Sequence, residues 1–162
     1  MRLENIIFHI DVNSAFLSWE AVYRLAHGAF TETAGQPAGC RMAYRGGGMD
    51  LREVPSAVGG DVTKRHGIIL AKSIPAKKYG IRTGETILEA RRKCPNLLLV
   101  PPNYGLYQAC SAAFLDILGE YSDTVEPYSI DEAFVDMTTT CHLFGTPVET
   151  AALIKDRIRE EL

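Results

Sequence analysis

The chain has 162 residues, of which 46% are hydrophobic, and its formal net charge at pH 7 is −3. This length and apolar content suffice for one domain core, or for one domain with a small insertion. No window approaches the roughly 18 consecutive apolar residues of a membrane span, and the N-terminus lacks a signal-peptide pattern. We therefore expect a cytoplasmic protein with no membrane partner. Its four cysteines are scattered without a C-x-x-C pair, which disfavours a disulfide framework or a zinc site.

The charges are unevenly distributed along the chain. Residues 61–93 carry nine Lys and Arg against three acids, a net charge of +6. Residues 101–154 carry eight acids and no Lys or Arg. The first segment suits phosphate groups and the second suits cations. Both also have an ordinary interpretation as solvated surfaces, and the acidic total argues weakly against a nucleic-acid-binding protein, because such domains are usually basic.

The N-terminal elements are expected to be a strand, a helix and an irregular segment. Residues 6–10 form an apolar run rich in β-branched residues, which predicts a strand that is buried on both faces and ends at Asp11. Apolar positions at helical spacing then predict a helix that Ser14 caps and that runs to about residue 26. Residues 27–50 have no periodicity and contain a glycine triplet, which is typical of a long irregular insertion.

Strands and helices are also expected in the rest of the chain, after residue 50. The expected elements are strands at 56–58 and 67–71, helices at 75–79 and 86–93, a strand at 97–100, a helix at 104–120, strands at 125–128 and 133–136, and a closing helix at 147–162. This order predicts an α+β fold with a ferredoxin-like layer, in which helices cover one face of a mainly antiparallel sheet. A small basic subdomain interrupts the layer.

Three acidic residues are expected to converge in this fold. Asp11 ends a strand, and Asp131 and Glu132 lie at the bend between two strands of what should be the same sheet. Carboxylates that lie within several ångströms of one another repel, so an ionised cluster generally needs a hard divalent cation. Two such ions roughly 3.5–4 Å apart are used in phosphoryl transfer. Spacing alone leaves a structural explanation open, because Asp is a common helix cap and Asp-Glu is common in turns.

Two sequence motifs resemble those of the Y-family (translesion) DNA polymerases. The segment IDVNSAF at residues 10–16 resembles their first catalytic motif, and YSIDEAFVD at residues 128–136 is very similar to the second, which is highly specific. Between them, LREVPSAVGG at 51–60 and AKKYGIR at 76–82 are similar to the fingers segment. The resemblance implies a first part of the palm at 1–26, an irregular insertion at 27–50, fingers at 51–93 and a second part of the palm at 94–162.

The resemblance also implies a catalytic metal site. Asp11 and Asp131 would bridge two Mg²⁺ ions, for which Mn²⁺ can substitute. Glu132 would hold the ion that activates the primer 3′-hydroxyl, and the backbone carbonyl of Val12 would complete the nucleotide-side ion. The catalytic residues implied are Asp11, Asp131 and Glu132.

A nucleotide pocket is implied in the same way. Phe16 falls at the steric-gate position, where an aromatic ring would clash with a ribose 2′-hydroxyl; the alternative is that it is a core residue of its helix. Ala15 replaces an aromatic residue beside the gate, and Ser73 is one of several small residues that would leave the pocket open. Lys77 replaces the commoner Arg on the incoming triphosphate, with Lys72 nearby.

Two departures from the family pattern bear on activity. Ile74 stands where the family usually has a Tyr that hydrogen-bonds the triphosphate, and Asn13 replaces an Asp that is not a metal ligand. The family continues beyond residue 162 with a thumb and a DNA-gripping C-terminal domain. We therefore expect a fragment with little activity alone, and any sliding clamp would bind through the part that is absent here.

The sequence thus predicts a DNA-directed DNA polymerase that acts in damage bypass on primer–template DNA and deoxynucleoside triphosphates. A catalytically silent relative that binds DNA or repair partners is the main alternative, and the isoleucine at position 74 supports it. A nucleotide cyclase built on a similar layer is a third interpretation, which the basic segment between the two motifs disfavours. The histidines at positions 9, 66 and 142 are expected to be structural or surface residues.

Overall fold

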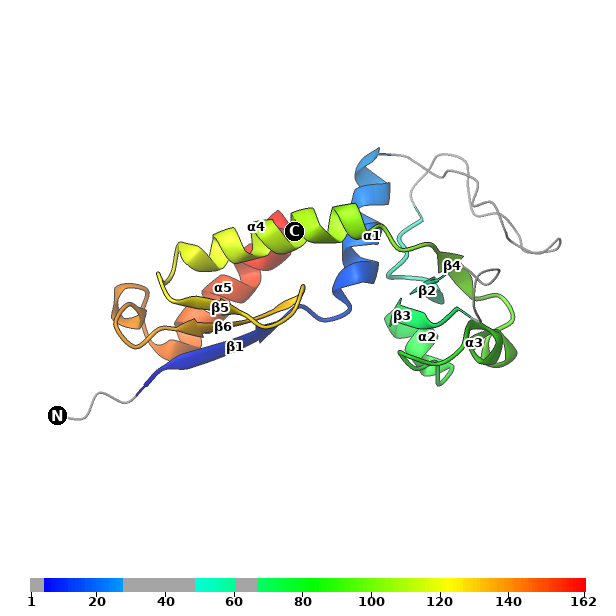
Figure 1. The fold of residues 1–162 in the computed structure, drawn as a ribbon, viewed down its shortest axis with the longest axis horizontal. Coiled ribbons are helices and arrows are strands. Elements are labelled where there is room, and N and C mark those ends of the chain that lie inside the picture. Colours follow the sequence, from blue (N-terminus) through cyan, green and yellow to red (C-terminus); the bar gives the residue numbers. More distant parts are fainter. Residues whose placement is uncertain (1–4, 28–48, 61–66) are drawn as a thin grey trace. The chain divides into compact units, whose positions relative to one another are not determined.

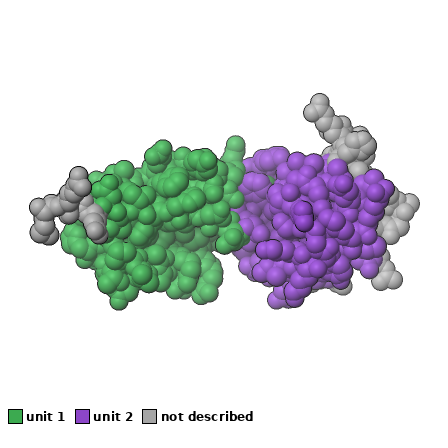
Figure 2. Space-filling model, turned by 90° about the horizontal axis from the view of Figure 1, so that it is seen from below, with its two compact units in different colours: residues 1–13, 105–162 green, residues 14–104 purple. Residues whose placement is uncertain are grey.

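The computed structural model describes residues 5–27, 49–60 and 67–162, and the chain divides into two compact units (Figures 1 and 2). Unit 1 comprises residues 1–13 and 105–162, and unit 2 comprises residues 14–104. Most of the insertion expected at 27–50 lies outside the described residues. None of the helices in the described ranges is long and apolar enough to cross a membrane.

Unit 1 is built on a three-stranded antiparallel sheet. Its strands are β1 (Ile7–Asp11), β6 (Glu132–Asp136) and β5 (Val125–Pro127), in the order β1-β6-β5. The register of the first pair places His9 opposite Phe134 and Asp11 opposite Glu132. Because side chains alternate between the two faces of a strand, His9 and Asp11 share one face with their partners.

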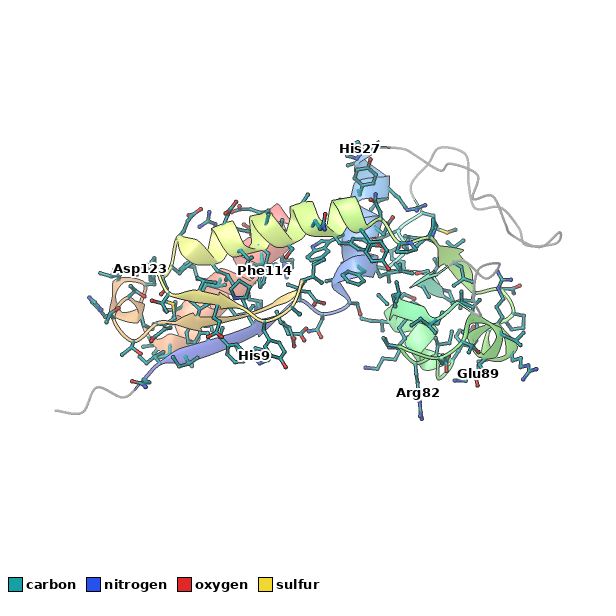
Figure 3. The ribbon with its side chains drawn as sticks, viewed as in Figure 1. His9, His27, Arg82, Glu89, Phe114 and Asp123 are labelled. Carbon is teal, nitrogen blue, oxygen red and sulfur yellow. The ribbon has the colours of Figure 1, made fainter. Side chains whose placement is uncertain are left out.

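Helices cover the other face of this sheet. α4 (Tyr104–Gly119) and α5 (Pro147–Glu161), with a short 3₁₀ helix at Cys141–Leu143 between them in sequence, contribute Phe114 and Ile154 to a core that includes Ala133 and Val135 of β6. Phe8 and Ile10 of β1 pack against the same core. In Figure 3, Phe114 lies between α4 and the sheet, whereas His9 projects from the opposite face. Hydrophobic burial therefore fixes which face of the sheet carries the acidic residues.

In its described residues, unit 2 holds a second small sheet and the helices α1, α2 and α3. β3 (Ile69–Lys72), β2 (Ser56–Gly59) and β4 (Leu98–Val100) lie in that order, with β2 antiparallel to β3 and parallel to β4. The helices are α1 (Ala15–His27), α2 (Ile74–Lys78) and α3 (Ile87–Lys93). A buried cluster joins the sheet to α2 and α3; its members are Ala57, Ile69, Ala76, Ile81, Ile87, Ala90, Cys94 and Leu97.

The structure confirms the α+β class and corrects one expectation. The strand expected to be buried on both faces is half-exposed instead, because helices pack on only one of its faces: Ile7 is 50% exposed and Phe8 is partly buried. The strand expected at 97–100 is present as β4, Leu98–Val100, and pairs with β2 in the sheet of unit 2. The compact units do not follow the implied palm and fingers boundaries residue by residue, and those boundaries stay a prediction.

The start of α5 provides a pH-dependent contribution to stability. The backbone N–H and the hydroxyl of Thr146 donate to the Glu149 carboxylate at 2.9 and 2.8 Å, and the Thr146 oxygen accepts the Glu149 N–H at 3.3 Å. The two donations, that of the backbone first, hold the pKa of Glu149 below its ordinary value. The stability from this capping box is therefore present above the unfolded pKa of about 4.3 and is lost as the pH falls through the lower folded pKa.

We predict that Glu149→Gln lowers the melting temperature at pH 7, because the amide keeps the capping geometry but loses the charge-assisted hydrogen bonds. The difference from the parent chain should shrink as the pH falls below about 4. Thermal unfolding followed by circular dichroism from pH 7 to pH 2.5 measures this. Glu89→Gln should behave alike, because Thr86 holds the pKa of Glu89 low in the matching box of α3. A difference that stays constant over the whole range would contradict the prediction.

Candidate active site

The β1–β6 pairing brings together the acidic residues that the sequence singled out. Asp11 is the last residue of β1 and lies directly opposite Glu132, the first residue of β6. Side chains of such cross-strand partners have Cβ atoms about 4.5–5.5 Å apart. The Val12 N–H donates to the Asp131 carbonyl oxygen at 3.0 Å, which extends the pairing by one step. Asp11, Asp131 and Glu132 therefore gather at one end of the sheet.

Ser129 organises the turn between β5 and β6. Its hydroxyl donates to Asp131 Oδ1 at 2.9 Å and lies 3.3 Å from Glu132 Oε2. The backbone N–H groups of Tyr128 and Ser129 both donate to the Glu132 carbonyl oxygen, at 2.9 and 3.1 Å. Ser129 stands inside the second motif, but the sequence pattern alone indicated no role for it. In the structure its hydroxyl bonds the side chain of Asp131 and approaches that of Glu132.

His9 joins the same group of side chains from β1. Its Nε2 lies 3.7 Å from Glu132 Oε1, and its ring stacks on Phe134 with centroids 4.5 Å apart and planes 13° from parallel. Tyr128 meets Phe134 edge-on, with centroids 5.8 Å apart. The expectation of a structural or surface histidine did not include this placement. Side chains two residues apart in a strand lie on the same face, so His9 and Asp11 share a face of β1. This signal would have placed His9 beside the acids if one face of the strand had been expected to be exposed.

The chemistry of these donors suits a hard divalent cation. Asp11, Asp131 and Glu132 offer only carboxylate oxygens, and the neighbouring backbone adds carbonyl oxygens, which are the ligands that Mg²⁺ and Mn²⁺ prefer. Like charges directly opposite each other in a sheet are destabilising, and a bound cation would relieve that repulsion. Within residues 5–27, 49–60 and 67–162, however, no three His, Cys, Asp or Glu side chains stand close enough together to hold a metal ion. The hydrogen bond from Ser129 holds the Asp131 carboxylate in its present orientation.

The residues implied for nucleotide binding lie in unit 2, on α1, on α2 and at the end of β3. Ala15 is buried at the beginning of α1, and the ring of the partly buried Phe16 lies 6.3 Å from that of Trp19 between centroids. Lys77 is exposed on α2. Lys72, at the end of β3, donates from Nζ to the Thr83 hydroxyl at 3.0 Å.

Ser73 has a structural role that the sequence analysis did not assign. Its buried hydroxyl donates to the Val54 carbonyl at 2.7 Å and accepts the backbone N–H groups of Ser56 and Ala76, both at 3.1 Å. It is therefore the N-cap of α2. These three hydrogen bonds occupy the hydroxyl and fix the start of α2.

The two motifs resemble those of a polymerase family, and comparison with known proteins identifies the family of this chain. Residues 37–162 match the impB/mucB/samB family, and the chain belongs to this family. It is 44% identical over 160 residues to DNA polymerase IV of Clostridium acetobutylicum, covering 99% of this chain and 36% of that protein. It is 39% identical over 157 residues to DNA polymerase IV 1 of Bacillus subtilis, covering 97% and 32%. The chain thus spans about a third of the length of these relatives.

Solved structures agree with the fold. DinB from Sulfolobus solfataricus matches with a TM-score of 0.73 and 23% identity, over 96% of this chain and 38% of that one. An insertion ternary complex of Dbh DNA polymerase matches with a TM-score of 0.73 and 24% identity, over 96% and 39%. These structures support the fold, and the family match together with the relatives named DNA polymerase IV confirms the resemblance that the two motifs indicated.

We predict that Asp11→Asn stabilises the chain in the absence of divalent cations, because it removes one of two like charges that face each other across β1 and β6. The free energy of unfolding should rise by roughly 0.2–1 kcal/mol. Urea denaturation in the presence of EDTA measures it. The matched control is Glu126→Gln, an exposed acid of β5 that lies opposite Phe134, and it should change little. A loss of stability in Asp11→Asn would show that the two carboxylates do not repel.

Proposed function

We propose that this chain carries the metal-binding part of a template-directed DNA polymerase of the translesion type. The polymerase adds deoxynucleotides to a primer 3′ end by two-metal phosphoryl transfer during damage bypass. The observation that carries the proposal is the strand register that sets Asp11 opposite Glu132. The carbonyl oxygen of Asp131 accepts a hydrogen bond from the N–H of Val12, the residue after β1. Relatives of the chain named DNA polymerase IV support it.

The residues of unit 1 would act by holding carboxylates in place. Asp11 and Asp131 would bind both of two Mg²⁺ ions, Glu132 the ion near the primer 3′-hydroxyl, and the Val12 carbonyl the ion on the nucleotide side. When bound, such ions lower the pKa of the attacking hydroxyl and neutralise charge on the leaving pyrophosphate. The chain contributes positioning: the ladder between β1 and β6 fixes the backbone of the acids, and Ser129 orients two of their side chains.

The residues of unit 2 would bind the deoxynucleoside triphosphate. Phe16 would exclude the ribose 2′-hydroxyl next to the small Ala15, and the exposed Lys77 would contact the triphosphate as a point charge. Lys72 would assist from the end of β3, and Ser73 would fix the start of α2. The partners are primer–template DNA and deoxynucleoside triphosphates, and unit 2 would include the fingers at 51–93.

A catalytically silent DNA-binding relative is the second candidate. Ile74 is 73% exposed at the beginning of α2, where the family usually presents a tyrosine hydroxyl to the triphosphate. An aliphatic side chain there offers no hydrogen bond to a phosphate. This interpretation requires that Asp11, Asp131 and Glu132 take no part in catalysis.

Single-nucleotide primer extension with the full-length protein distinguishes the two functions. Asp131→Ala with Glu132→Ala should abolish magnesium-dependent, template-directed incorporation on undamaged and abasic templates, because two metal ligands are lost. The control, Asp116→Ala with Asp123→Ala, removes two exposed acids of unit 1 outside this turn and should retain the parent activity. No incorporation by a folded, DNA-binding parent protein would favour the silent relative.

We also predict that Phe16→Ala in the full-length protein weakens the discrimination against ribonucleotides, because the ring that would meet the 2′-hydroxyl is removed. The ratio of kcat/KM for deoxynucleotides over ribonucleotides should fall on the order of 10²-fold. The control Val22→Ala changes an exposed residue of the same helix and should leave the ratio unchanged. An unchanged ratio in Phe16→Ala would mean that Phe16 is only a packing residue of α1.

A further inference from the structure

The face of the unit 1 sheet that bears the acids also bears an aromatic group that the proposed mechanism does not use. His9 and Phe134 are direct cross-strand partners, one pair along from Asp11 and Glu132 on the same face. Their rings are nearly parallel at 4.5 Å, and Tyr128 packs edge-on against Phe134. Offset-stacked and edge-on contacts of this kind stabilise ring orientation. The imidazole of His9 is therefore held in place although 48% of its side chain is exposed.

The held imidazole points toward one oxygen of the Glu132 carboxylate. Its Nε2 lies 3.7 Å from Oε1, which is longer than a direct hydrogen bond but within reach of electrostatic and van der Waals contact. The other oxygen, Oε2, lies 3.3 Å from the Ser129 hydroxyl. The carboxylate is thus bounded on both sides, by His9 from β1 and by Ser129 from the turn. Such supports limit the orientations that a flexible Glu side chain samples.

We propose that His9 is a positioning residue for Glu132, whose carboxylate it holds ready for a divalent cation through its ring nitrogen. The inference rests on the proposed function, since Glu132 must be a metal ligand for its orientation to matter. Residues that orient a metal ligand affect affinity because they reduce the ordering that binding requires. The stack on Phe134 supplies rigidity, and the nitrogen supplies the contact.

Binding of Mn²⁺ to this chain, measured by water-proton relaxation, tests the inference without relying on catalysis. His9→Ala should weaken Mn²⁺ affinity by about 10-fold. His9→Phe, which keeps an aromatic ring to stack on Phe134 but lacks the nitrogen, should also weaken it, and His9→Gln should restore part of the affinity. Ile7→Ala is the matched control, because Ile7 is exposed on the same face of β1 and lies opposite Asp136. It should bind Mn²⁺ like the parent chain.

A double-mutant cycle separates positioning from independent binding. If His9 acts through Glu132, then His9→Ala adds little further loss once Glu132→Gln is present. Full additivity, or parent-like affinity in His9→Phe, would overturn the inference while leaving the metal site intact. Unchanged Mn²⁺ affinity in Glu132→Gln and in Asp11→Asn would instead overturn the metal site of the proposed function, and the inference with it. Thermal unfolding of each variant verifies that the chain remains folded.

Discussion

The antiparallel pairing of β1 with β6 is the constraint on which the rest of unit 1 depends. A slip of one residue would exchange the two faces of a strand, moving Asp11 toward the helices and Ile10 into solvent. The core prevents this, because Phe8, Ala133 and Val135 pack together beneath α4 and α5. The same burial that stabilises the sheet therefore brings Asp11 opposite Glu132. The packing of the core is thus sufficient to fix the backbone positions of Asp11 and Glu132.

This arrangement concentrates negative charge where the sheet alone would disfavour it. Two acids face each other across a strand pair, and a third, Asp131, directly precedes Glu132 in the turn. Functional sites often retain such locally unfavourable contacts, which the surrounding structure has to offset. In this chain the offset comes from Ser129, which bonds Asp131 and approaches Glu132, and from the packed core on the other face. A divalent cation would convert the repulsion into coordination.

The sequence predicted the elements better than their surroundings. Long amphipathic patterns carry much information, and the helix expected at 104–120 is α4, Tyr104–Gly119. The apolar run of β1 did not reveal that one face is exposed, since Ile7 reads as a core residue although it is half in solvent. The three-residue β4 carries too little pattern to specify β2 as its partner. The α+β class was predicted correctly nonetheless, because it depends on the order of the elements.

In the candidate site, too, the residues could be predicted from local sequence, whereas their contacts could not. Asp11, Asp131 and Glu132 could be named from motifs, because the residue types and their order are local properties of the chain. The contacts of His9 could not, since they depend on which residues of β6 stand opposite β1. Pairing turns a position two residues before Asp11 into a neighbour of Glu132, more than a hundred residues away in sequence. Ser129 lies inside the second motif, so a motif can contain a supporting residue, whereas the contact of His9 with Glu132 becomes visible only through the strand register.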